Sequence, residues 1–296
     1  MMMHKSFRWS GLIAIAAATL AYGIKSAPAD LTNDVPSCYK ANHVKLPAGG
    51  KYANLVYVLI DQTVQWNNQL EHEVIDNLNR LLVPGTKFVI TEFSAFSQGR
   101  YLQVLESGII EKPLPQAQEG NTPEEEIAPL KQCLHDQFGF AKLTAERAAL
   151  QAMRASTDTL DQSDILAALK TIALAVKVSP AKHKVLIVVS DGLENSSITS
   201  FYGAGTVRVI NPELEMAKAE KADVIGNFAG TRVYFIGGAL MPPATHGTLA
   251  ERNGYRSPTV LHALSEFWHN YFAKSDADLV DFGEPSLVVP VRYGHN

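Results

Sequence analysis

Two short apolar segments, NLVYVLID at residues 54–61 and KVLIVVSDG at residues 184–192, decide the fold of this chain. Each contains at least five consecutive apolar residues, and an aspartate, Asp61 or Asp191, stands at or next to the end of each. An apolar run without polar alternation is typical of a strand buried on both faces, as in a parallel sheet. We therefore expect both segments to be central strands.

Helix-like and strand-like segments alternate around these two strands. KFVITEF (87–93) and residues 101–110 read as strands joined by a turn at 97–100, and so short a connection makes them antiparallel. The other predicted elements are helices at 70–81, 124–155 with a break at 138–139, 165–178, after 212 and after 258, and strands at 232–236 and 287–289. The pattern predicts a doubly wound open α/β sheet, mostly parallel with one antiparallel edge strand.

The composition excludes several classes of protein. The chain has 296 residues, of which 46% are hydrophobic and 19% charged, so it is long and apolar enough for a sizeable core. The net charge of −4 gives no global support for nucleic-acid binding, which needs clustered Lys and Arg. Two cysteines are too few for a disulfide-built small fold or a structural zinc site.

The N-terminus has the three parts of a secretory signal. Lys5 and Arg8 precede an apolar run at 11–24, and Ala27 and Ala29 fit a cleavage site. The run has 14 residues, fewer than the roughly 20 that span a bilayer. We expect cleavage after about Ala29, a secreted or periplasmic protein of net charge −7, and no membrane span after removal. An uncleaved N-terminal membrane anchor is the alternative.

Export changes the meaning of the cysteines. Cys38 and Cys133 are the only pair, and an oxidising compartment allows them to form a disulfide. Two independent thiols are the alternative. We expect a signal peptide at residues 1–29 and an N-terminal arm at 30–52. One α/β domain should follow at 53–290, with an inserted loop and helical region at 111–156, and then a C-terminal tail at 291–296.

Side chains with oxygen atoms follow the two central strands. In an open α/β sheet, ligands bind at the carboxyl ends of the strands near the topological switch point, so Asp61 and Asp191 are expected to face one crevice. Thr63 and Ser163 add hydroxyl groups near the same place. Such a set of oxygen ligands suits Mg²⁺ or Ca²⁺. Alternatively, Ser163 caps its helix and Asp191 belongs to an ordinary turn.

Three segments resemble the motifs of a von Willebrand factor type A (vWA) domain. DQTVQ (61–65) is similar to the family's D-x-S-x-S element, SDILAAL (163–169) to its second element, and VVSDGLEN (188–195) to its third. The order of elements, including the reversed third strand, matches over roughly residues 53–290. The resemblance implies a three-layer α/β fold with a metal-ion-dependent adhesion site (MIDAS).

The resemblance also implies a set of metal ligands. By position, Asp61, Thr63, Ser163 and Asp191 would hold the ion directly or through water, and a carboxylate of a protein partner would complete its shell. Gln65 departs from the motif, because the family has a second Ser there. Its amide oxygen would take that role with a different geometry, or the site would be altered or empty.

These observations favour a non-catalytic binding module in a cell-envelope or surface assembly. The alternatives are a metal-independent scaffold and a metal-assisted phosphoester hydrolase. The hydrolase is disfavoured because no His, Cys or Lys stands beside Asp61 in the sequence, and the second Asp of aspartyl-phosphate phosphatases is lacking. No H-x-x-x-H pair or G-x-S-x-G motif occurs, so a zinc or serine hydrolase is also disfavoured.

Overall fold

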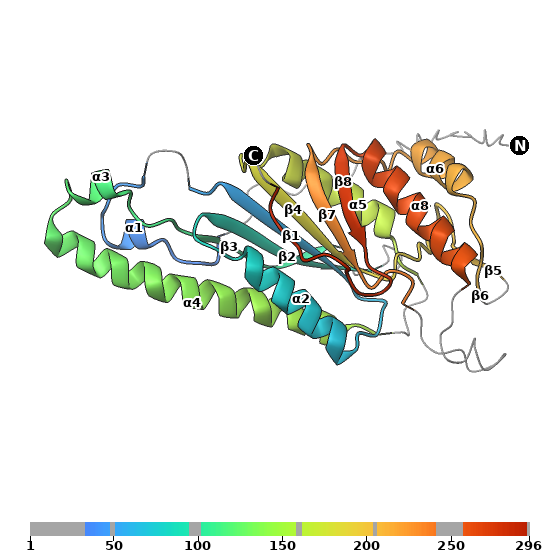
Figure 1. The fold of residues 1–296 in the computed structure, drawn as a ribbon, viewed down its shortest axis with the longest axis horizontal. Coiled ribbons are helices and arrows are strands. Elements are labelled where there is room, and N and C mark those ends of the chain that lie inside the picture. The colour runs from blue at the N-terminus through green and yellow to red at the C-terminus, as the bar shows by residue number, and fades with distance from the viewer. Residues whose placement is uncertain are drawn as a thin grey trace, which may run out of the picture. The chain divides into compact units, whose positions relative to one another are not determined.

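A six-stranded sheet lies at the centre of the computed structural model, which describes residues 33–47, 51–94, 102–157, 162–203, 206–240 and 257–294. The strand order is β3-β2-β1-β4-β7-β8 (Figure 1). The strands are β1 (Asn54–Asp61), β2 (Thr86–Phe93), β3 (Gln103–Ile110), β4 (His183–Val189), β7 (Thr231–Ile236) and β8 (Ala277–Phe282). Leu31–Asn296 forms one compact unit, and the predicted signal peptide lies outside the described residues.

The pairing of the strands confirms the expected fold class. β1 is parallel to both β2 and β4, and β7 is parallel to both β4 and β8. Only β3 is reversed, and it pairs with β2 at one edge of the sheet. Residues 55–60 of β1 are all buried, as the unbroken apolar run predicts, because helices cover both faces of the sheet.

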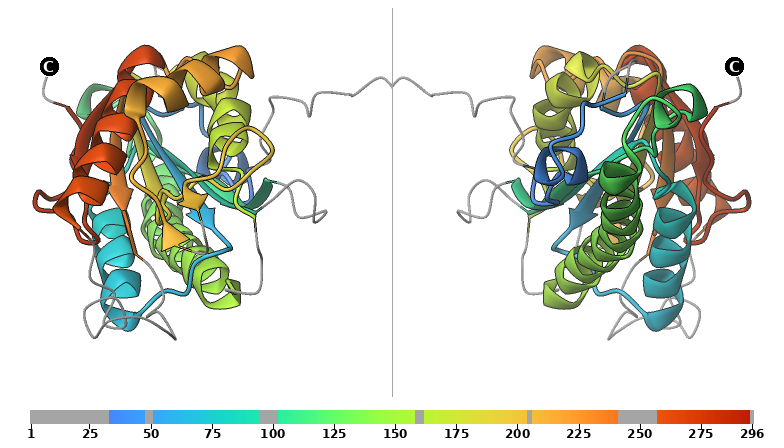
Figure 2. Two further views of the ribbon diagram at one scale, coloured as in Figure 1. Left: turned by 90° about the vertical axis from the view of Figure 1, so that its right-hand side faces the viewer. Right: turned by 90° about the vertical axis from the view of Figure 1, so that its left-hand side faces the viewer.

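Helices form a layer on each face of the sheet (Figure 2). α2 (Asn68–Leu81) and α4 (Glu124–Ala155) cover one face, and α5 (Ile165–Val178), α6 (Pro212–Lys221) and α8 (Pro258–Lys274) cover the other. Alternate residues of β1 divide between the two cores: Val56, Val58 and Ile60 lie with α2 and α4, and Leu55, Tyr57 and Leu59 with α5 and α8. The short elements are α1 (Cys38–Ala41), α3 (Gln116–Glu119), β5 (Tyr202–Gly203) and β6 (Thr206–Val207).

A disulfide between Cys38 and Cys133 ties the N-terminal arm to α4, which confirms the predicted bridge. It closes a loop of 95 residues. The N-terminal part of α4 extends past the sheet and meets α1 there (Figure 1). Next to the bridge, the buried carboxylate of Glu111 accepts hydrogen bonds from the Ser37 hydroxyl and the Cys38 N–H.

Two predicted details are wrong. α4 is continuous through 138–139, because the packing of residues such as Ala141 and Ala145 against the sheet outweighs the roughly 1 kcal/mol cost of a helical glycine. The last strand is β8, and residues 287–289 are not a strand. The N–H groups of Val288 and Val289 instead donate to the carboxylate of Asp281, at 2.7 and 3.0 Å.

Candidate metal centre

The candidate site lies where the order of strands reverses. β1 leads to β2 on one side, whereas its other neighbour, β4, leads to β7 in the opposite direction. Asp61 is the last residue of β1, and Ser190 and Asp191 directly follow β4. Ser163, just before α5, pairs through its backbone with Asn195 of the segment after β4. Because β1 and β4 are parallel, their carboxyl ends lie side by side, and both acidic residues lie at this end of the sheet.

The carboxylate of Asp61 is the centre of a hydroxyl cluster. Its Oδ1 accepts hydrogen bonds from the Thr63 N–H at 2.9 Å and the Thr63 hydroxyl at 2.7 Å. Its Oδ2 accepts from the Ser163 hydroxyl at 2.9 Å and the Ser190 hydroxyl at 2.8 Å. Three segments distant in sequence therefore place hydroxyl oxygens within 3 Å of one carboxylate.

Burial makes this carboxylate costly to ionise. Asp61 has no exposed surface, and this burial raises its pKa, while the hydrogen bonds from Thr63, Ser190 and Ser163 lower it in part. Among the residues that the structure describes, no Lys, Arg or His forms an ion pair with Asp61. A buried negative charge is strongly destabilising unless a positive charge compensates it. A bound divalent cation would supply that charge.

The residues after β4 hold Asp191 in a fixed turn. Its side-chain Oδ1 accepts the Leu193 N–H at 2.8 Å, and its carbonyl oxygen accepts the Ala239 N–H at 2.7 Å. Gly192 has a positive φ of 73°, and a Cβ there would come within 2.8 Å of the indole nitrogen of Trp268. That nitrogen donates to the Gly192 carbonyl at 3.0 Å, so α8 also anchors this turn.

The structure brings most of the predicted site residues to one place. Asp61, Thr63 and Ser163 are joined by direct hydrogen bonds, and Asp191 follows Ser190, which also bonds to Asp61. Gln65 is exposed, and no described contact joins it to this cluster. Ser163 is not the side-chain cap of α5, because its hydroxyl donates to Asp61 and the N-cap position belongs to Asp164.

The sequence motifs did not predict Ser190 as a residue of this site, although its hydroxyl bonds to Asp61. A hydroxyl residue between a buried strand and an Asp-Gly pair is its only sequence signal, and that signal is weak because the direction of a strand-end side chain depends on the pleat. In the structure Ser190 is fully buried, and its oxygen also accepts the Gly192 N–H at 3.1 Å. It therefore connects the Asp61 carboxylate to the turn that carries Asp191.

The donor set fits a hard cation. Carboxylate and hydroxyl oxygens are the ligands that Mg²⁺ and Ca²⁺ prefer, and both ions commonly retain water as well. Within the described ranges, no three His, Cys, Asp or Glu side chains gather in a way that could hold a metal ion. An ion at this end of the sheet would therefore depend on Asp61, on the hydroxyls of Thr63, Ser163 and Ser190 that bond to it, and on Asp191 in the adjoining turn.

Comparison with known proteins yields structural likenesses of low score. No protein-family model and no curated protein matches the chain. PilB minor pilin from Streptococcus sanguinis is 12% identical, with 78% of this chain and 63% of that chain covered and a TM-score of 0.35. SpaC pilus adhesin from Lactobacillus rhamnosus GG is 13% identical over 79% and 31%, with a TM-score of 0.34. The TFIIH p34 N-terminal domain is 11% identical over 74% and 98%, with a TM-score of 0.30.

These likenesses are too distant to transfer a property of the three proteins to this chain. The chain also spans only 63% and 31% of the lengths of the first two. The vWA resemblance of the three motifs therefore stays an interpretation of the sequence. In the part of the chain that the structure describes, no helix combines the length and apolar character that a membrane crossing needs.

Proposed function

We propose that this chain is an exported vWA-like binding module that recognises a protein partner through a divalent cation at the Asp61 site. The ion, Mg²⁺ or Ca²⁺, would be held by Asp61 and Asp191 with the hydroxyls of Thr63, Ser163 and Ser190. An acidic side chain of the partner would complete its coordination. We place the module in a secreted or periplasmic setting, in keeping with the predicted signal peptide and the Cys38–Cys133 disulfide.

The observation that carries this proposal is the fully buried Asp61 carboxylate, which is surrounded by neutral hydroxyl donors. This arrangement lies at the carboxyl ends of the strands, which is where open α/β folds bind ligands. A carboxylate in such surroundings is unfavourable by itself, since its partners carry no positive charge. A bound divalent cation would attract the negative charge of Asp61 and so offset the cost of burying it.

A metal-independent scaffold is the second candidate. Two observations favour it: Gln65 stands apart from the cluster, and hydrogen bonds already satisfy both oxygens of Asp61. In that case the hydroxyl cluster would serve only to join β1, β4 and α5. A metal-assisted phosphoester hydrolase is a third reading, and turnover of a generic phosphoester that requires Asp61 would be its signature.

The proposed function is tested by affinity capture from the envelope fraction of the source cells, with and without EDTA. We expect the wild-type chain to retain a defined partner in Mg²⁺ or Ca²⁺ and to release it in EDTA. Asp191→Ala should lose the partner under both conditions, whereas Asp281→Ala, which changes a carboxylate on β8, should keep it. If neither EDTA nor Asp191→Ala reduces capture below that of the wild-type chain in Mg²⁺ or Ca²⁺, the scaffold is favoured instead.

A further inference from the structure

The segment of residues 190–201, here called the Asp191 loop, carries a second buried carboxyl group. Glu194 has no exposed surface, and its Oε2 accepts the N–H of Leu166, in the first turn of α5, at 3.0 Å. This N–H is one of the groups that a helix start leaves without a partner inside the helix. The N-cap residue Asp164 makes no side-chain capping bond. Glu194 therefore does for α5 what an N-cap side chain normally does.

The contact lies next to the metal centre. Asn195 exchanges two backbone hydrogen bonds with Ser163, at 3.0 and 3.1 Å. Glu194 thus binds the first turn of α5, while the next residue in the chain binds the residue whose hydroxyl reaches Asp61. Together they join the two segments that supply Ser163 and Asp191 to the site.

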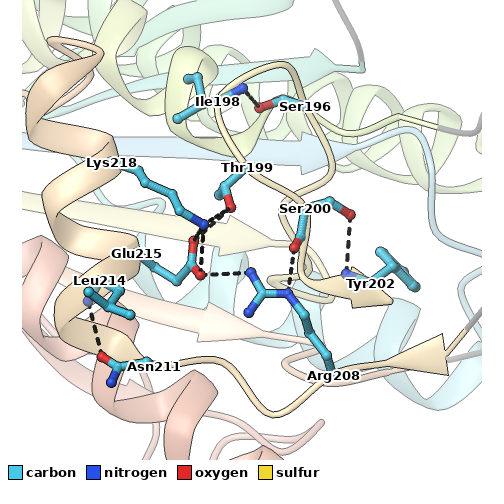
Figure 3. A network of polar contacts seen from close by, with 10 residues as sticks. All are labelled: Ser196, Ile198, Thr199, Ser200, Tyr202, Arg208, Asn211, Leu214, Glu215 and Lys218. Carbon is cyan, nitrogen blue, oxygen red and sulfur yellow. Dashed lines mark hydrogen bonds and ion pairs between the residues drawn. The ribbon is translucent and has the colours of Figure 1, made fainter. Parts of the chain in front are cut away.

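The other end of the Asp191 loop is held by a separate polar network (Figure 3). The Thr199 hydroxyl donates to Oε2 of Glu215 on α6 at 2.6 Å. Glu215 also pairs with Arg208 at 2.7 Å and with Lys218 at 2.9 Å. This network fixes the loop to α6, and within the described residues none of its side-chain hydrogen bonds or ion pairs reaches α5 or Asp61. It provides an internal control for the role of Glu194.

We propose that Glu194 is a positioning residue of the metal centre, which holds the start of α5, and with it the Ser163 hydroxyl, against the Asp191 loop. The inference rests on the proposed metal-dependent function and adds a residue that would not touch the ion. The carboxyl group acts as a hydrogen-bond acceptor at a helix start. Its hydrogen bond runs from the Asp191 loop to the first turn of α5. This bond would set the separation between the segment that carries Ser163 and the loop that carries Asp191.

Loss of this acceptor has a defined structural consequence. In Glu194→Ala, the buried N–H of Leu166 loses its partner, which costs about 1–3 kcal/mol. The start of α5 is then free to move toward water, and Ser163 moves with it. Residues that orient metal ligands typically change metal affinity by about 10- to 100-fold when they are removed. We expect a loss of that size for Mg²⁺ or Ca²⁺.

Three variants and the wild type are compared by calorimetric titration with Mg²⁺ and Ca²⁺, and by thermal unfolding in EDTA. Glu194→Ala should weaken the ion's binding by about 10- to 100-fold. Glu194→Gln keeps an acceptor oxygen at the same reach and should bind the ion as the wild type does. Thr199→Val removes a buried hydrogen bond from the same loop and should lower the melting temperature without changing ion affinity. If Glu194→Ala does not fold, Glu194→Asp replaces it, because the shorter side chain withdraws the acceptor from Leu166.

The outcomes separate the two claims. Weak binding in Glu194→Ala, with wild-type binding in Glu194→Gln and Thr199→Val, supports the positioning role. Wild-type affinity in Glu194→Ala overturns it, and so does an equal loss in Glu194→Ala and Thr199→Val, because that would reflect general destabilisation. Absence of ion binding in the wild type would instead overturn the proposed function itself, and the positioning role with it.

Discussion

The buried carboxyl of Glu194 should make the free energy of unfolding fall as the pH rises. We expect the substitution Glu194→Gln to remove this pH dependence. Burial raises its pKa to about 8 from an ordinary value of 4.5. Asp164 adds to this rise, and hydrogen bonds from Ser196, Leu166 and Ile165 oppose it. At neutral pH the folded chain therefore keeps a proton on Glu194 that the unfolded chain has lost.

The sign and the size of the effect follow from proton linkage. Between pH 4.5 and about 8 the folded state binds more protons at this site, so the free energy of unfolding falls as the pH rises. The contribution is fully present below pH 4.5 and lost above about 8. Each pH unit within this window costs about 1.4 kcal/mol, so the loss approaches about 3 kcal/mol at pH 7 and about 5 kcal/mol above pH 8.

Glu194→Gln removes this titration while keeping the shape and the acceptor oxygen of the side chain. We expect its unfolding free energy, relative to the wild type, to rise by about 3 kcal/mol between pH 4.5 and pH 7 and to level off above about pH 8. Guanidinium unfolding in EDTA across pH 4.5–9 measures this difference. Glu125→Gln, at an exposed position of α4, is the matched control and should follow the wild type. Parallel pH curves for Glu194→Gln and the wild type would refute the reasoning.

Three further changes test other parts of the account. Replacing Cys38 and Cys133 by Ser should lower the unfolding free energy by about 4–5 kcal/mol, as expected for a loop of 95 residues, in denaturant titration. Gly108→Ala should lower the melting temperature, because the new Cβ would lie 2.4 Å from a Val35 methyl; unchanged melting would contradict this packing. Ser190→Ala should raise the pKa of the central carboxylate further by removing a stabilising donor, as followed by carboxyl NMR titration.

The central strands were predictable because their sequence allows few other structures. The apolar runs of β1 and β4 leave no polar face to expose. The stretch of chain between Phe93 and Gln103 is too short for a parallel crossover. β8 was missed because ADLVDF (277–282) carries two acidic residues, and its strand character comes from pairing with β7. Residues 287–289 are more apolar, but apolar character alone does not supply a neighbouring strand.

The candidate site was predictable in its residue types but only partly in its contacts. Asp61 and Asp191 follow from their place at the ends of buried strands. Gln65 has the right spacing but is exposed, in the segment between the end of β1 and the start of α2. Ser190 and Glu194 required the three-dimensional path of the Asp191 loop, since each acts on a residue more than 25 positions away.

Calorimetric titration of residues 30–296 with Mg²⁺ and with Ca²⁺ tests the central claim most directly. The account predicts saturable binding of one ion per chain in the wild type and its loss in Asp61→Asn, which keeps the size of the side chain but removes the charge that attracts the cation. Glu73→Gln, at a carboxylate of α2 outside the site, should bind the ion normally. No saturable binding in the wild type, or equal binding in Asp61→Asn, would contradict a metal centre at the end of β1.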